Sequence, residues 1–148
     1  MRILIIGYGN PLRSDDGFGW RAAERLSELI RDPEIEVLAL HQLTPELMDS
    51  LSRAEFAIFI DACEGPEPGL MAERQVAPQS SGQASFTHHV TPEALLGGAR
   101  LLYGRAVEAI MITVAGADFS LGAELSAGVA ARLEEVIAAV LRRIEERG

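Results

Sequence analysis

The sequence predicts an α/β fold with a mainly parallel sheet, and two observations support this prediction. Short β-branched or apolar runs alternate along the chain with stretches in which apolar residues recur at helical spacing. This alternation is typical of βαβ units, whose strands lie parallel. Residues 3–6 and 56–60 are apolar at every position, and such runs indicate strands that helices cover on both faces.

Five strands and four helices are predicted, with no internal repeat, low-complexity tract or domain linker between them. The strands are the β-branched or apolar runs at residues 2–7, 35–40, 56–62, 70–76 and 106–114, of which 70–76 is a short edge strand inside a loop. The helices are the stretches with helical spacing at residues 17–30, after Thr44, at 91–103 and from Ser126 onward. We therefore expect a single domain over residues 1–148.

Three of these helices begin with residues that favour a helix start. Thr44 and Thr91 each precede a proline, and this pair is typical of an N-cap followed by the first helical position. Ser126 precedes the last helix, in which apolar residues such as Leu133 and Ile137 form one stripe. We expect all three hydroxyl side chains to cap their helices.

Composition and charge exclude several classes of function. The chain has 148 residues, of which 48% are hydrophobic and 24% charged, as in ordinary globular proteins. No apolar run approaches the roughly 20 residues that span a bilayer, and the opening run at residues 3–6 is too short for the apolar core of a signal peptide. A net charge of −9 with scattered basic residues argues against a nucleic-acid partner. The single cysteine, Cys63, agrees with a reducing compartment, so we expect a cytoplasmic protein without a membrane partner.

Ionisable residues stand at three points where predicted strands end. Asp15 and Asp16 follow the first strand, Asp61 ends the third, and His88 and His89 stand just before a helix. Ligands of open parallel sheets bind beyond the carboxyl ends of the strands. Asp61 is the most informative of the five, because a lone carboxylate after five apolar residues is costly to bury unless another group pairs with it.

Two carboxylates and an imidazole at one edge of a sheet allow two kinds of chemistry. They suit a divalent ion such as nickel or zinc and leave coordination positions open. Without a metal, they can act as general acid and base. Structural roles are also open: Asp15 and Asp16 as a charged first helical turn, Asp61 as a turn residue, and the histidines as exposed loop residues.

The other polar and glycine signals are weaker. Cys63 is expected to pack as a small hydrophobic residue, and a nucleophilic role with His88 is the alternative. His41 has no acidic neighbour in the sequence and is expected at the surface. Gly7 and Gly9 resemble the start of a dinucleotide-binding loop, but the position of its third glycine is Leu12. The two aspartates that follow would also place negative charge where a pyrophosphate binds.

The segment 7–19 resembles the opening of the hydrogenase maturation proteases. Their motif is a strand followed by Gly-x-Gly-Asn-x-Leu, then Asp-Asp or Asp-Glu, a glycine and a second glycine, and this segment matches it throughout. The resemblance continues at residues 61–62, at 87–88 before the helix that starts at Thr91, and at 122–126 before the last helix. It therefore covers essentially the whole chain.

The resemblance implies a three-layer α/β/α protein with a twisted, mostly parallel five-stranded sheet. It implies an endopeptidase, with carboxylates at its site, that removes the C-terminal extension of a nickel–iron hydrogenase large-subunit precursor loaded with nickel. By motif, Asp16, Asp61 and His88 would contact that nickel, with spacing favouring His88 over His89. Nickel would arrive with the substrate, so no permanently bound cofactor is expected. A non-catalytic nickel- or hydrogenase-binding module of the same fold is the alternative.

Overall fold

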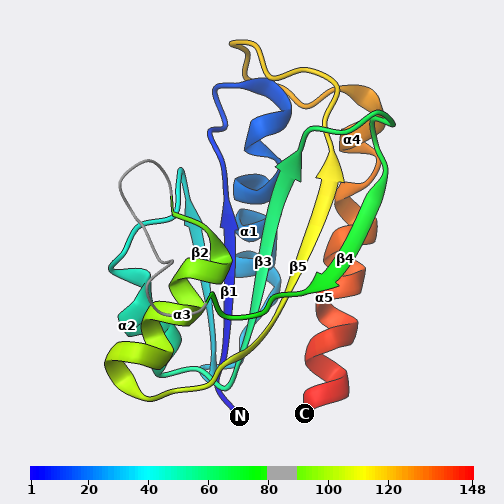
Figure 1. Cartoon of the computed structure of the whole chain (residues 1–148). Coiled ribbons are helices and arrows are strands. Elements are labelled where there is room, and N and C mark those ends of the chain that lie inside the picture. The colour runs from blue at the N-terminus through cyan, green and yellow to red at the C-terminus, as the bar shows by residue number, and fades with distance from the viewer. Residues whose placement is uncertain (80–89) are drawn as a thin grey trace.

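A five-stranded mixed sheet forms the centre of the computed structural model, which describes residues 1–79 and 90–148 (Figure 1). The strand order is β2-β1-β3-β5-β4. All neighbouring strands are parallel except β4, which runs antiparallel to β5 at one edge. The strands are β1 (Ile3–Tyr8), β2 (Ile35–Leu40), β3 (Phe56–Cys63), β4 (Met71–Gln75) and β5 (Glu108–Ala115).

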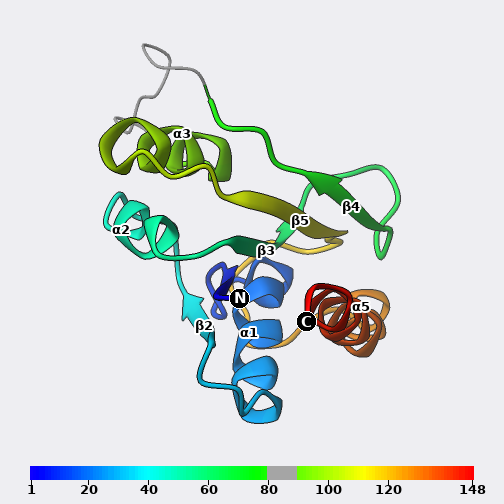
Figure 2. The ribbon, with the colours of Figure 1, turned by 90° about the horizontal axis from the view of Figure 1, so that it is seen from below.

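Helices cover both faces of this sheet, which makes three layers. Figure 2 shows α1 and α5 on one face and α2 and α3 on the other. The helical segments are the 3-10 helix η1 (Ser14–Gly17), α1 (Phe18–Leu29), α2 (Leu47–Ser52), α3 (Pro92–Tyr103), α4 (Ala127–Ala130) and α5 (Leu133–Arg147). The predicted fold class is confirmed. Within residues 1–79 and 90–148, no helix is long and apolar enough to cross a membrane.

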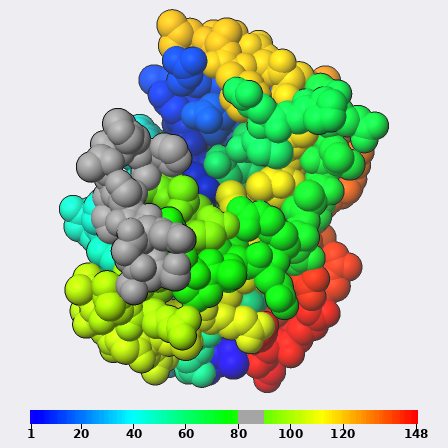
Figure 3. Space-filling view, in the orientation of Figure 1, coloured from blue at the N-terminus to red at the C-terminus, as the bar shows by residue number. Residues whose placement is uncertain are grey.

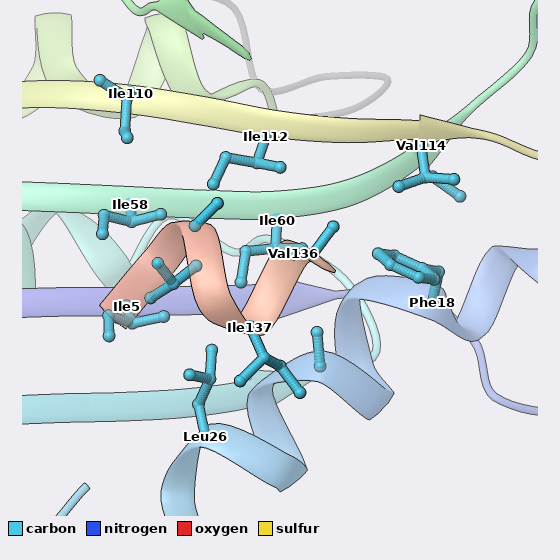
Figure 4. Packing of buried hydrophobic residues seen from close by; sticks show 14 of the residues in the cluster. Ile5, Phe18, Leu26, Ile58, Ile60, Ile110, Ile112, Val114, Val136 and Ile137 are labelled. Atoms are coloured by element: carbon cyan, nitrogen blue, oxygen red, sulfur yellow. The ribbon is translucent and has the colours of Figure 1, made fainter. Parts of the chain in front are cut away.

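The apolar strands are explained by the alternation of side chains between the two faces of the sheet. Ile58 of β3 lies in register with Ile5 of β1 and Ile110 of β5, and all three pack with α1 and α5 (Figure 4). The neighbouring Ala57 and Phe59 belong to the second core cluster, with α2 and α3. Since both faces are covered, every position from Phe56 to Ile60 is buried and none of them needs to be polar.

Of the three predicted helix caps, the one at Thr91 is confirmed and the one at Thr44 is wrong. The Thr91 Oγ1 accepts a hydrogen bond from the Ala94 N–H at 3.1 Å. After Thr44, the chain first makes a turn, in which the Leu47 N–H donates to the Thr44 carbonyl at 3.1 Å, and α2 begins only at Leu47. The Thr44 hydroxyl instead hydrogen-bonds the side chain of Glu46, which lowers the pKa of that carboxyl.

The predicted continuous last helix is also wrong. It is divided into α4 and α5 by a turn at residues 131–132. Ser126 stands at the N-cap position of α4 but makes no capping bond with its side chain. Its hydroxyl donates to Asp15 at 2.8 Å instead. A tertiary partner therefore replaces the local helix N–H as the partner of this hydroxyl.

Glycines bring the start of α1 into direct contact with the strand ends. A Cβ atom on Gly19 would lie 2.2 Å from the Ile60 carbonyl oxygen of β3, so only glycine fits there. Gly9 has a φ of 145°, and a Cβ atom at this position would lie 1.8 Å from the Asp16 carbonyl oxygen. These glycines serve close packing of backbone on backbone, and they hold η1 directly above the carboxyl ends of β1 and β3.

Candidate active site

A cavity of about 380 Å³ opens at the carboxyl ends of the central strands. Its lining includes the carboxylates of Asp16 and Asp61, together with Tyr8, the loop 41–45 and Val90. The cavity lies where the chain order reverses: β1 is connected to β2 on one side and lies beside β3 on the other. Such a switch point leaves a crevice between helices that turn away to opposite faces, and it is where α/β folds bind ligands.

Asp61 lies within β3, in register with Thr113 of β5, so it is not a turn residue. Its Oδ1 accepts the N–H of Ala62 at 2.8 Å. Burial raises the pKa of this carboxyl to about 7, helped by the nearby charge of Asp16 and opposed by hydrogen bonds from Ala62 and Tyr8. A carboxyl with this pKa can hold or release a proton near neutral pH.

Tyr8 is a site residue that the sequence interpretation missed. It is the last residue of β1, lines the cavity and hydrogen-bonds Asp61. Burial and the charge of Asp61 raise the pKa of its phenol, so the hydroxyl remains a donor at neutral pH. The signal in the sequence was a polar atom at the carboxyl end of an otherwise apolar strand, beside a glycine.

Asp16 lies in η1 and lines the same cavity as Asp61. Its Oδ2 accepts the backbone N–H of Asn10 at 2.9 Å. The Oδ1 of Asn10 in turn accepts the N–H of Leu12 at 2.9 Å, which gives the loop an internal turn. Two of the three predicted site residues, Asp16 and Asp61, are therefore brought together, and Asn10 fixes the loop that carries the first of them.

Asp15, the neighbour of Asp16, is fully buried and points away from the cavity into a polar cluster. Its carboxylate accepts the N–H groups of Ala117 (2.8 Å), Asp118 (3.0 Å) and Ser126 (2.8 Å) as well as the Ser126 hydroxyl. Burial alone would raise the pKa of Asp15, but these hydrogen bonds outweigh it and hold the pKa below the usual value. Asp15 is therefore not an exposed charge in the first helical turn. Its carboxylate connects the loop that precedes α1 to the loop that follows β5.

Figure 3 shows these two loops in contact at the upper end of the molecule, where the yellow and orange residues that follow β5 lie on the blue β1–α1 loop. Backbone bonds reinforce the contact: the Ser14 N–H donates to the Gly122 carbonyl and the Asp15 N–H to the Asp118 carbonyl, both at 2.9 Å. We call residues 10–17 and 116–126, joined in this way, the loop clamp. It fixes the position of Asp16 at the cavity.

The remaining candidates have different outcomes. His88 and His89 lie outside the described residues, so a third ligand stays a prediction, although Val90 lines the cavity. His41 is exposed, as expected, but also lines the cavity, with its ring 6.5 Å from that of Trp20.

Cys63 is a free, half-buried thiol at the end of β3. Its proposed pairing with His88 lies outside what the structure describes.

Asp16 and Asp61 offer carboxylate oxygen to whatever enters the cavity. In the parts of the chain that the structure describes, no three or more His, Cys, Asp and Glu residues lie together as a metal site. Two carboxylates in one cavity can act as acid and base. They can also complete the coordination of a metal ion that already has other ligands.

Comparison with known proteins identifies relatives of this chain in sequence and in fold. No family model matches the chain. The hydrogenase expression/formation protein HupM of Azotobacter chroococcum mcd 1 is 30% identical over 152 residues, covering 99% of this chain and 73% of HupM. The hydrogenase maturating endopeptidase HybD from E. coli superposes with a TM-score of 0.81 at 26% identity, covering 100% of this chain and 94% of HybD. A hydrogenase 2 maturation peptidase from Thaumarchaeota archaeon SCGC_AB-539-E09 gives a TM-score of 0.76 at 27% identity, covering 98% and 99%.

The sheet topology and the similarity to solved maturation endopeptidases over essentially the whole chain define the protein as a peptidase built on a three-layer α/β/α fold. It belongs to the hydrogenase maturation protease family. This membership supports a role in hydrogenase maturation.

Proposed function

We propose that this peptidase removes the C-terminal extension of a nickel–iron hydrogenase large-subunit precursor after nickel has been loaded. The observation that carries the proposal is the convergence of Asp16 and Asp61 in one cavity at the switch point of the sheet. Carboxylates in one cavity could contact nickel that the substrate carries. The precursor and the enzyme would meet in the cytoplasm.

In the proposed reaction, nickel that the precursor holds through its own cysteines contacts Asp16, Asp61 and His88. This contact places the scissile peptide bond in the cavity. The reacting groups are then held close together in a suitable orientation and need not meet by diffusion. Water, activated by the ion or by a carboxylate, adds to the peptide carbonyl, the C–N bond breaks and the leaving nitrogen receives a proton. Asp61 has a pKa of about 7 before the precursor binds, so the carboxylate form that contact with nickel requires is present above that pH.

The test is to mix the purified protein with the nickel-loaded precursor and to follow loss of the C-terminal peptide by mass spectrometry. We expect the wild type to cleave, Asp16→Asn to lose at least about a hundredfold in rate, and the exposed control Asp49→Asn to match the wild type. Binding of the precursor without cleavage would favour the binding-module alternative. Inactivation by iodoacetamide would favour a nucleophilic Cys63.

A second prediction concerns the pH dependence of processing. Since the pKa of Asp61 is about 7, the rate at low precursor concentration should rise about tenfold per pH unit below 7 and level off above it. The hydrogen bond from Tyr8 lowers this pKa, so Tyr8→Phe should move the midpoint to higher pH. Groups that titrate on the precursor are common to both enzymes and do not affect the comparison.

The pH profiles of wild type, Tyr8→Phe and the control Tyr103→Phe, measured on one precursor preparation, check this prediction. Tyr103 is exposed at the end of α3, and its profile should coincide with that of the wild type. An unchanged midpoint in Tyr8→Phe, or a shift to lower pH, would contradict the role of Asp61 as the titrating group.

A further inference from the structure

His41 lines the cavity but has no part in the proposed reaction. It directly follows Leu40, the last residue of β2, and shares the cavity with Asp61 of β3. Both strands pair with β1, one on each side. Neighbouring strands lie about 4.8 Å apart, so the backbones of His41 and Asp61 are roughly 10 Å apart across the end of β1. A peptide in the cavity can therefore contact the imidazole on one side and the carboxylate on the other.

The imidazole of His41 is held in place by its neighbours. Its ring lies in an edge-on contact with Trp20 of α1, at an angle of 60° between the ring planes. Before it in the chain, the Leu40 carbonyl accepts the Gly9 N–H at 3.0 Å, which ties the ends of β2 and β1 together. After it, Leu43 is buried in the second core cluster. The position of the imidazole is therefore set before a substrate binds.

The ring nitrogens of His41 are available to a bound molecule. Neither of them makes a hydrogen bond or an ion pair with another residue in the part of the chain that the structure describes. An imidazole carries at least one N–H donor, whether the ring is neutral or charged. The cavity therefore contains a positioned hydrogen-bond donor that no protein group uses.

The other polar side chains of the cavity are less suited to donate a hydrogen bond to a substrate. As carboxylates, Asp16 and Asp61 are acceptors only. The Tyr8 hydroxyl hydrogen-bonds Asp61, and the Thr44 hydroxyl hydrogen-bonds a neighbouring carboxyl. Gln42 also lines the cavity and carries amide donors, so it is the competing candidate.

We propose that His41 is a catalytic residue, whose imidazole N–H donates a hydrogen bond to the oxygen of the scissile peptide carbonyl. The proposal rests on the proposed function for the identity of that bond. When water adds to the carbonyl carbon, an electron pair moves to the oxygen and negative charge develops there. A donor that is already in position stabilises this charge more than it stabilises the uncharged substrate, which lowers the barrier. His41 forms no covalent bond and transfers no proton in this role.

The test measures kcat and KM by mass spectrometry of the released C-terminal peptide. In His41→Ala, we expect kcat to fall about a hundredfold, as when one oxyanion donor is removed, with KM changing less than about threefold. His41→Gln keeps an N–H donor and should recover about tenfold of this loss. His41→Phe keeps an aromatic ring against Trp20 but has no donor, so it should be as slow as His41→Ala. The control Glu36→Gln, at an exposed position on β2, should match the wild type.

The other outcomes overturn either this inference or the proposed function as well. An unchanged kcat in His41→Ala, or a change in KM alone, overturns the catalytic role of His41 while the proposed function stands. Equal rates for the Gln and Phe variants of His41 overturn its role as a donor, and this comparison also decides if His41→Ala does not fold. A larger loss of kcat in Gln42→Ala than in His41→Ala would assign the donor to Gln42. A wild type that does not cleave the loaded precursor overturns both the proposed function and the role of His41.

Discussion

The Asp61→Asn variant is expected to lose processing of the nickel-loaded precursor by about a thousandfold or more and to melt at a higher temperature than the wild type. Asparagine keeps the shape of the side chain and can still accept the Ala62 N–H, but it carries no charge and takes up no proton. Loss of a charged ligand or of the acid–base group removes several kcal/mol of transition-state stabilisation. The gain in stability has a separate cause.

That gain follows from the raised pKa of Asp61. The unfolded chain ionises this carboxyl near its usual value of about 3.9, whereas the folded protein ionises it at about 7. Between these values the folded state binds more protons, so stability falls as pH rises through the window and stays reduced above it. Asparagine avoids this loss, which we put at about 2 kcal/mol near pH 8, below the full linkage value because water still reaches the side chain.

Thermal melts at pH 4 and pH 8 measure the effect of Asp61→Asn. We expect the melting temperature of Asp61→Asn to exceed that of the wild type by roughly 4–8 °C at pH 8. The difference should be smaller at pH 4, where ionisation of Asp61 has cost the wild type little stability. The control Asp32→Asn, at an exposed position between α1 and β2, should show no such dependence on pH. A lower melting temperature for Asp61→Asn at pH 8 would contradict the assignment of a raised pKa.

The Asp15→Ala variant is expected to lose about 3–5 kcal/mol of unfolding free energy, because several buried N–H groups of the loop clamp lose their acceptor. The pKa of Asp15 is lowered in the folded protein. Its contribution to the unfolding free energy is therefore complete at pH values above its pKa in the unfolded chain, about 3.9, and is lost as the pH falls through its pKa in the folded protein. The difference in unfolding free energy between wild type and variant should therefore be largest at neutral pH and become smaller at acid pH.

Urea unfolding at pH 7 and pH 3 checks this prediction, with Asp16→Ala as the matched control. Asp16 is the adjacent residue, half-buried, and accepts one backbone N–H, so its removal should cost about 1 kcal/mol or less. Equal losses in the two variants would show that the clamp does not depend on the Asp15 carboxylate.

The fold could be predicted because its determinants are local. The strands at 3–6 and 56–60 carry apolar residues at every position, and burial on both faces is the physical reason. The cap at Thr91 is also local, since its partner is three residues away. Ser126 failed as a cap because its partner, Asp15, is 111 residues away, a separation at which no local pattern applies.

The site could be predicted only in part for the same reason. Asp61 could be identified because a carboxylate interrupts an apolar run, and Asp16 because it follows a strand. The sequence did not separate Asp16 from Asp15, since their different roles depend on which side of η1 meets residues 117–126. Tyr8 was missed because a tyrosine in a strand is equally suited to a core position, and only the register with β3 places it beside Asp61.

The loop clamp also determines when the site can form during folding. The η1 segment that carries Asp16 is tied to residues more than a hundred positions later in the chain. Contacts of this separation form late, because closing so long a loop costs entropy that only the nearly complete structure offsets. A growing chain can pair β1 with β2 early, but it cannot present a finished cavity until Ser126 has been synthesised and β5 has joined the sheet. We therefore expect the cavity to form only after nearly the whole chain has been synthesised.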